Sequence, residues 1–227
     1  MGEVSAVRNA RIVFGKDQEC RYISHLDLNR VMLRAVQKSG LNIWRTEGFN
    51  THPYITFALP LSLGYVSRCE TMDFRLLDDD EDMDAVPAML NACLPAGIRV
   101  YSCCDAVHKP ADITAAVYTV ELSVSPDADA AVDLYPAMTS FLSLSSVMVE
   151  KKTKKGMKTV DLRPLILDCT AERCDGGVRL TMTLPAGPSE NINPSLFVTA
   201  FSAYCRTELY SVITREKILI KDGEPFV

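Results

Sequence analysis

No long hydrophobic run occurs in this sequence, and that absence bears on where the protein is found. No uninterrupted apolar stretch reaches the roughly 18–20 residues that a membrane-spanning helix needs, so we expect no membrane association. The first residues lack a basic region followed by an apolar stretch, which predicts a cytoplasmic protein without a secretory signal. The 227 residues are 48% hydrophobic, enough for one large core or two small ones. The net charge of −5 argues against a nucleic-acid coat over the whole surface but permits a local basic patch.

Motifs of several enzyme classes are missing as well. The sequence contains no P-loop, no Gly-x-Gly-x-x-Gly motif and no Gly-x-Ser-x-Gly nucleophile elbow. Its eight cysteines include no Cys-x-x-Cys pair. In a reducing cytosol, scattered cysteines serve as small buried hydrophobic residues, and an iron–sulfur or zinc site is the weaker alternative. We therefore expect neither a metal nor a cofactor in this chain.

The first half of the chain predicts the order strand, helix, strand, strand, helix, strand. Ser24 is typical of a helix N-cap, with Asp27 in place of the usual Glu of a capping box, and Gly40 is typical of a left-handed C-cap. Apolar residues recur between them at helical spacing. The predicted strands and extended segments cover residues 8–15, 41–45, 54–59, 70–77 and 98–103, and the second helix covers residues 83–94.

The second half predicts the same order of elements. Its extended segments cover residues 118–124, 147–150, 160–169, 178–184 and 211–220, and its helices cover residues 130–142 and 194–205. Two successive βαββαβ units account for the whole length. We therefore predict an α+β fold of two tandem ferredoxin-like units with antiparallel sheets, with domains at residues 1–110 and 111–227.

A histidine at a predicted helix start is the first candidate site. His25 follows Ser24 and precedes Asp27, where a first helical turn offers unpaired N–H groups and a positive dipole end. Such a turn can bind an anion, and its histidine can act as a general acid or base. The alternative is that Ser24 and Asp27 only cap the helix.

A polar loop that contains a second histidine follows about twenty residues later. Gly48, Asn50 and His52 lie between two predicted extended segments, and Pro53 restricts the backbone before it. Such a loop presents ligands from a rigid scaffold, or it is a wide hairpin whose side chains bond their own backbone. The candidates for a catalytic role are thus His25, His52 and Asp27, and their spacing shows no metal motif.

A lysine-rich segment is the third candidate. Residues 151–158 hold five lysines, which are Lys151, Lys152, Lys154, Lys155 and Lys158. They can follow a nucleic-acid backbone, or they keep a solvated hairpin arm from pairing with other strands. Arg163 follows and can clamp a phosphate or carboxylate with two hydrogen bonds.

Four stretches resemble the radical-SAM-linked domain family of unknown function. They are residues 21–30 (RYISHLDLNR), 47–53 (EGFNTHP), 57–64 (FALPLSLG) and 158–164 (KTVDLRP). Members of that family stand alone or are fused to the C-terminal side of a radical SAM protein, so the resemblance implies an accessory or substrate-handling module. The partner would carry the iron–sulfur cluster and S-adenosylmethionine, because this chain has no Cys-x-x-x-Cys-x-x-Cys motif.

Three functions are consistent with these features. The favoured one is a non-catalytic partner of a radical SAM protein that holds RNA or a ribosome-associated substrate. Tandem ferredoxin-like units also occur in RNA-processing proteins, so an RNA-processing or RNA-modifying enzyme with a histidine acid/base is an alternative, although by analogy of fold alone. A metal- or small-ligand-binding module is the third. The binding residues expected in the first unit are Ser24, His25, Asp27, Arg30, Gly48, Asn50 and His52. The sequence does not indicate the oligomeric state.

Overall fold

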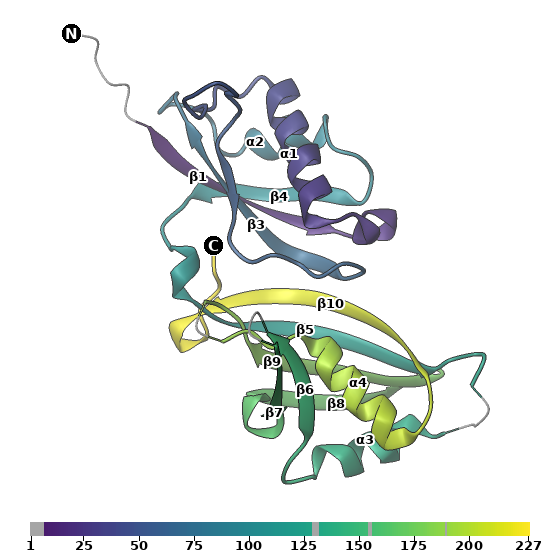
Figure 1. Ribbon diagram of the computed structural model, residues 1–227. Helices are drawn as coiled ribbons and strands as arrows, with labels where there is room; N and C mark the ends of the chain where they lie inside the picture. Colours follow the sequence, from purple (N-terminus) through teal and green to yellow (C-terminus); the bar gives the residue numbers. More distant parts are fainter. Residues whose placement is uncertain (1–6, 129–131, 154–155, 189) are drawn as a thin grey trace. The chain divides into compact units, whose positions relative to one another are not determined.

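The computed structural model describes residues 7–128, 132–153, 156–188 and 190–227 (Figure 1). The chain divides into two compact units, of which the first comprises Met1–Asp112 with Pro225–Val227 and the second Ile113–Glu224. Each unit combines helices with antiparallel strand pairs, so the fold is mixed α+β, as the sequence predicts. Within the described residues, no helix is long and apolar enough to cross a membrane.

The first unit is built on a sheet with the strand order β4-β1-β3-β2. Each neighbouring pair is antiparallel. The strands are β1 (Arg8–Lys16), β2 (Ile55–Phe57), β3 (Val66–Leu76) and β4 (Ile98–Asp105). The helices are α1 (His25–Ser39) and α2 (Val86–Asn91), with short 3-10 helices η1 (Gln18–Tyr22) and η2 (Pro110–Asp112).

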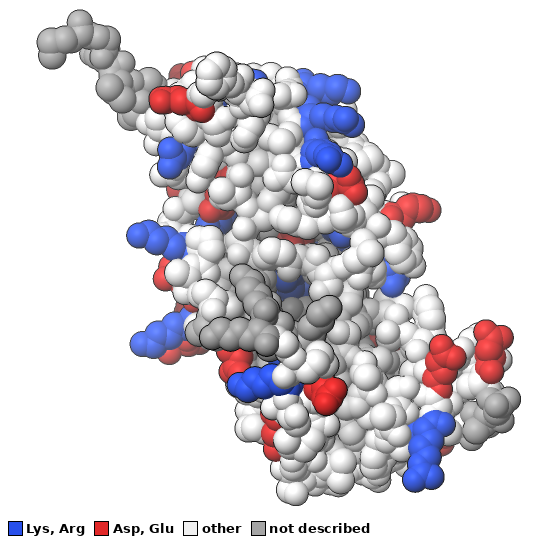
Figure 2. Space-filling view, in the orientation of Figure 1, with Lys and Arg blue, Asp and Glu red and all other residues white. Residues whose placement is uncertain are grey.

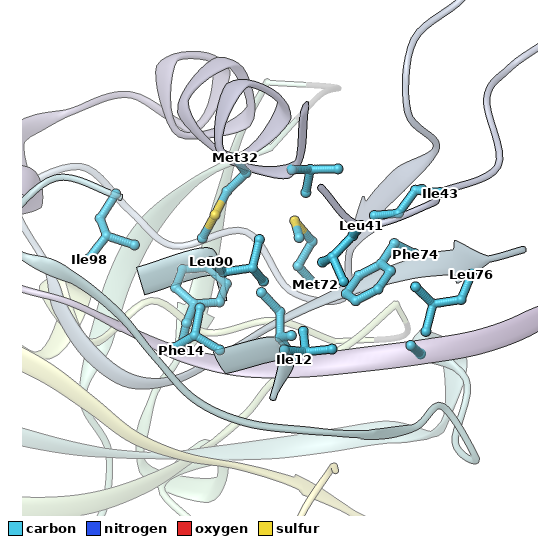
Figure 3. Packing of buried hydrophobic residues seen from close by; sticks show 14 of the residues in the cluster. Ile12, Phe14, Met32, Leu41, Ile43, Met72, Phe74, Leu76, Leu90 and Ile98 are labelled. Carbon is cyan, nitrogen blue, oxygen red and sulfur yellow. The ribbon is translucent and has the colours of Figure 1, made fainter. Parts of the chain in front are cut away.

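The core of the first unit lies between the sheet and its two helices. Alternate residues of β1 point to one side, where Ala10, Ile12 and Phe14 are fully buried. Met32 of α1 and Leu90 of α2 reach the same cluster (Figure 3). Burying each large side chain stabilises the unit by about 1.5–3 kcal/mol. The helices therefore share one face of the sheet, and the polar side of α1 faces outward.

The caps of α1 agree with the prediction at both ends. Asp27 N donates to Ser24 Oγ at 3.1 Å, which satisfies one unpaired donor of the first turn. Gly40 adopts φ 84°, a left-handed conformation that glycine tolerates without steric cost. Ser24 and Gly40, which flank the helix, therefore determine where α1 begins and ends.

The second unit has a sheet with the strand order β10-β5-β9-β8, again with antiparallel pairs. Between α3 and β8 the chain inserts a hairpin, β6–β7, that pairs only with itself in the described residues. We call this hairpin the lysine arm. The elements are β5 (Ile113–Val124), α3 (Leu134–Leu142), β6 (Met148–Thr153), β7 (Gly156–Asp161), η3 (Arg163–Leu165), β8 (Asp168–Cys174), β9 (Gly177–Pro185), α4 (Pro194–Cys205), β10 (Leu209–Ile220) and η4 (Lys221–Gly223).

The predicted strand at residues 41–45 is wrong. The segment forms only two isolated bridges, Ile43 with Leu76 and Arg45 with Pro53. The outer edge of β3 is shared, because Ile55 of β2 pairs with Phe74 on the same edge. Each backbone group on a strand edge can bond only one neighbouring segment. Because β2 already pairs with this edge of β3, residues 41–45 form a single bridge there and not a continuous strand.

Helices α2 and α3 and strand β2 are shorter than predicted, and one predicted extended segment is interrupted. Helix α2 begins at Val86 rather than at residue 83, because Ala85 supplies no side-chain cap and Pro87 lies in the first turn. Helix α3 begins at Leu134, where Asp133 Oδ1 accepts from Tyr135 N at 3.2 Å. Residues 130 and 131 of the predicted helix lie outside the described residues. Pro164 in η3 interrupts the extended segment predicted for residues 160–169.

Candidate functional site

The first turn of α1 is a closed hydrogen-bond network. Ser24 Oγ donates to Asp27 Oδ2 at 2.7 Å, and Arg30 Nη1 donates to Asp27 Oδ1 at 3.0 Å. The carboxylate accepts from the Ser24 hydroxyl and also from the backbone N–H of Ser24, as in the predicted capping box. The Ser24 hydroxyl and then the Arg30 guanidinium hold the pKa of Asp27 below its ordinary value. Asp27 is therefore an ionised acceptor, unsuited to donate a proton near neutral pH.

His25 lies at the surface of the same turn and contacts an aromatic ring from another element. Its ring centroid is 5.1 Å from that of Phe57 in β2, with the rings at 76°, an edge-to-face arrangement. Phe57 in turn contacts Phe14 of the core at 6.3 Å. This chain of rings joins the start of α1 to β2 and fixes where the imidazole stands. It also joins the first and third of the four stretches that carry the family resemblance.

His52 lies in a loop that is closed at its base. Thr46 N donates to His52 O at 2.9 Å, and His52 N donates to Thr46 Oγ1 at 3.2 Å. The ring Nδ1 lies 3.0 Å from Pro53 O, which can only accept, so Nδ1 carries a proton and donates. The backbone of this loop is therefore closed like that of a wide hairpin, which was one of the two interpretations of the sequence.

The tip of this loop points into solvent. Gly48 adopts φ 117°, which permits the sharp turn, and Gly48 and Asn50 are exposed. Phe49 between them is fully exposed, at 109% of its reference area. Phe49 is not among the predicted binding residues, although a large aromatic side chain between two turn-forming residues was the available signal.

No hydrogen bond or ring contact joins His25 to His52, both of which belong to the described part of the chain. His25 pairs with Phe57, and His52 bonds Pro53 and Thr46. Likewise, no group of three His, Cys, Asp or Glu side chains is placed to hold a metal ion among residues 7–128, 132–153, 156–188 and 190–227. Each histidine is thus held by its own set of contacts in the first unit.

The lysine arm carries two cross-strand lysines. Lys151 lies directly opposite Lys158, and Lys152 opposite Met157; Lys154 and Lys155 lie outside the described residues. Lys151 Nζ donates to Asn191 O at 2.6 Å, which anchors the arm to the segment before α4. Lys158 is exposed. Two like charges in direct opposition cost about 0.2–1 kcal/mol, so a bound anion would stabilise the arm.

Asp161 closes the base of the arm. Its Oδ1 accepts from Val147 N at 2.8 Å and from Arg163 N at 3.0 Å. These two backbone N–H groups hold the pKa of Asp161 below its ordinary value. Asp161 thus bonds the backbone of Arg163, and the half-buried Arg163 side chain follows the arm at the start of η3.

All eight cysteines are thiols and lie in the described part of the chain. Burial raises the pKa of Cys103 to about 12 and that of Cys169 to about 11. Because the thiolate is the reactive form, these two side chains are inert at neutral pH. The sequence predicts buried cysteines, whereas all eight are half-buried.

A hollow in the first unit is lined by other residues than those predicted. It has a volume of about 390 Å³, and its wall includes Asp17, Gln18, Arg99 and Tyr101. A second hollow, of about 280 Å³, lies beside the Asp133–Arg173 ion pair in the second unit. Residues 98–103 are predicted as a strand, but no function is predicted for the exposed Arg99 and Tyr101 of that strand.

Comparison with known proteins gives one family. Residues 9–194 match the family described as "Uncharacterized protein conserved in bacteria (DUF2344)". The chain belongs to this family. The matched DUF2344 segment contains each of the candidate residues from Ser24 to Arg163, and the Tyr101 hollow as well.

Comparisons with individual proteins add little to the family. No curated protein matches the chain. Among solved structures, the chain is similar to an unknown protein from Galdieria sulphuraria at 14% identity and a TM-score of 0.26, covering 92% of this chain and 99% of that one. A likeness at that score carries no argument about fold or function.

Proposed function

We propose that the protein is a non-catalytic partner of a radical SAM enzyme, and that it holds RNA or a ribosome-associated substrate for that enzyme. The radical SAM part rests on the resemblance of four stretches of the sequence. The observation that carries the proposal is the exposed Phe49 at the tip of a loop with a fixed base.

Phe49 has the character of a docking anchor. Its side chain is 109% exposed in the chain alone. An aromatic ring of that size stabilises a complex when a partner buries it. The loop beneath it is held by Thr46 and His52, and Arg45 Nη2 adds a bond to Thr51 O at 3.0 Å. A rigid base lowers the entropy lost on binding, which favours association with a protein partner.

The exposed face of α1 supports the RNA-holding part. Arg30, Arg34 and Lys38 recur every four residues, so they form one stripe along the helix, which we call the α1 stripe. Figure 2 shows basic side chains gathered over α1. A concentrated stripe on a chain of net charge −5 favours local contact with a polyanion. Lys151 and Lys158 of the lysine arm provide a second basic surface.

The geometry of the candidate acid/base residues favours a binding role over catalysis. Asp27 is committed to Ser24 and Arg30, and its lowered pKa removes it as a proton donor. Metal-free RNA cleavage requires an acid and a base at one phosphate, and the contacts of His25 and His52 do not hold the two rings as such a pair. Each histidine then serves as a hydrogen-bonding surface group.

The strand order supports a finer assignment of the fold. Numbered within each unit as β1–β4 or as β5, β8, β9 and β10, both sheets have the order 4-1-3-2 with antiparallel neighbours, and a helix follows the first and the third strand. A split βαβ arrangement has this order. We therefore assign each unit to the ferredoxin-like class, with the lysine arm inserted in the second, and we place the protein in the cytoplasm, where its eight thiols are stable.

Co-purification with a radical SAM protein tests the proposal. The wild-type chain, Phe49→Ala and the control Leu63→Ala are each mixed with the purified cognate radical SAM protein and separated by size. Leu63 is a matched control because it is also exposed, at 63%. We expect complexes with the wild type and Leu63→Ala and a weakened one with Phe49→Ala. Absence of a wild-type complex would overturn the proposal.

A further inference from the structure

The hollow beside Tyr101 has the dimensions of a ligand site. Its volume of about 390 Å³ falls within the ~300–1000 Å³ usual for ligand pockets. Its wall comes from the end of β1, the start of η1, the turn at residues 95–97 and the first half of β4. It belongs to the first unit alone.

Tyr101 lines this hollow, and the phenol end of its side chain lies beside Gly15 of β1. A Cβ added at Gly15 would overlap the Tyr101 hydroxyl and lie 2.9 Å from its Cζ, so glycine at that position leaves room for the phenol end of Tyr101. The ring is supported on one side by β1, yet the residue is 50% exposed. A tyrosine held in this way offers a flat apolar face on which a base can stack.

A cation and two hydrogen-bonding groups surround the ring. Arg99 lies two residues before Tyr101 on β4, hence on the same face of the strand, and it is exposed. Asp17 and Gln18 form another part of the wall and supply an acceptor and an amide. Gln18 adopts φ 47°, a left-handed conformation that non-glycine residues hold chiefly where the surroundings impose it.

Hydrogen bonds hold the rim of the hollow in place. Asp17 N donates to Gly97 O at 2.8 Å, and Cys20 Sγ donates to Ala96 O at 3.2 Å. Asn91 bonds both backbone groups of Val100, each at 2.9 Å. The wall is therefore formed before any ligand arrives, which reduces the cost of binding.

We propose that this hollow binds one nucleotide of single-stranded RNA, with the base stacked on Tyr101, the phosphate at Arg99 and the base edge toward Asp17 and Gln18. The inference rests on the proposed function in taking RNA as the substrate. It adds a site that is distinct from the α1 stripe. Single-stranded RNA is favoured over a duplex because only an unpaired base can leave its stack to lie on an aromatic ring.

Binding of a labelled single-stranded oligoribonucleotide tests the site by fluorescence anisotropy at low salt. Tyr101→Ala should weaken binding about 5- to 150-fold, the range measured for removal of one stacking ring. Tyr101→Phe keeps the ring and should retain wild-type affinity. Gly15→Ala should weaken binding like Tyr101→Ala, because the new methyl group displaces the ring. The double variant should be no weaker than either single one, since both remove the same stacking interaction.

Controls separate this site from other causes. Thermal unfolding of each variant verifies that the unit is folded, and an RNA duplex of the same sequence should bind without dependence on Tyr101. Wild-type affinity in both Tyr101→Ala and Gly15→Ala would overturn the site and leave RNA binding by other surfaces intact. A poly-glutamate peptide that binds with the same dependence on Tyr101 would also overturn it. No RNA binding by the wild type would overturn the site together with the RNA-holding role, whereas the radical SAM complex is measured independently.

Discussion

The ring of His25 meets the ring of Phe57 edge to face, with centroids 5.1 Å apart. Phe57 follows His52 in sequence by only five residues, so the start of α1 and the end of the exposed loop are fixed to one strand, β2. The contact holds the exposed imidazole of His25 beside the core of the first unit. Its strength can be measured as a coupling energy between the two side chains.

The His25–Phe57 contact should appear as a coupling energy. In a double-mutant cycle with His25→Ala and Phe57→Leu, we expect about 0.5–1.5 kcal/mol of coupling, the value typical of aromatic pairs. Urea unfolding measures it. The same cycle with His52→Ala serves as the control and should give no coupling. Equal coupling for the two histidines would contradict the geometry.

The N-cap at Ser24 should matter for stability. Ser24→Ala removes the acceptor for Asp27 N and should lower the free energy of unfolding by about 1 kcal/mol. The urea midpoint should fall while the slope of the transition stays constant. Ser24→Asn restores a capping side chain and should recover most of the stability. A Ser24→Ala variant as stable as the wild type would mean that the observed cap contributes nothing.

The base of the lysine arm should loosen in acid. Because the folded-state pKa of Asp161 is lowered, its contribution is fully present above the unfolded-state pKa and is lost as pH falls through the folded-state value. The amide resonances of Val147 and Arg163 should shift with that midpoint, below the ordinary range of an aspartate. In Asp161→Asn both amides should show no such titration. A midpoint in the ordinary range would contradict the two hydrogen bonds.

The α1 stripe should determine part of the salt dependence of RNA binding. Replacing Arg30, Arg34 and Lys38 by Gln should reduce the slope of log affinity against log salt by up to about 2, because each phosphate that a protein neutralises on a single strand adds about 0.7 to the slope. Titrations of a single-stranded oligoribonucleotide at several salt concentrations give the slope. Arg173→Gln is the control, because that arginine is exposed and ion-paired like Arg30 but belongs to the second unit. Equal slopes in the wild type and the triple variant would remove α1 from the interface.

Local signals account for the parts of the fold that the sequence predicts well. Ser24 and Gly40 bound α1, and Pro194 opens α4, whose range Pro194–Cys205 agrees with the prediction. In each case one or two residues at the end of the helix decide the boundary. The strand prediction for residues 41–45 is wrong because β2, which lies outside that segment, pairs with the same edge of β3.

The candidate site was harder to predict because its parts come together through strand register. Gly15 and Arg99 face one another only because β1 pairs with β4 in one alignment, and this brings Tyr101 over Gly15. Nothing in the local sequence around Tyr101 records that pairing. The exposure of Phe49 and the contact of His25 with Phe57 likewise depend on packing between segments distant in sequence.

The affinity of the purified chain for its cognate radical SAM protein tests the central claim most directly. Calorimetry should detect a complex with the wild type and with Leu63→Ala. Phe49→Ala should weaken it by at least about 2 kcal/mol, as removal of a buried aromatic anchor does. Heat changes no larger than dilution for the wild type, with both proteins folded, would contradict the account.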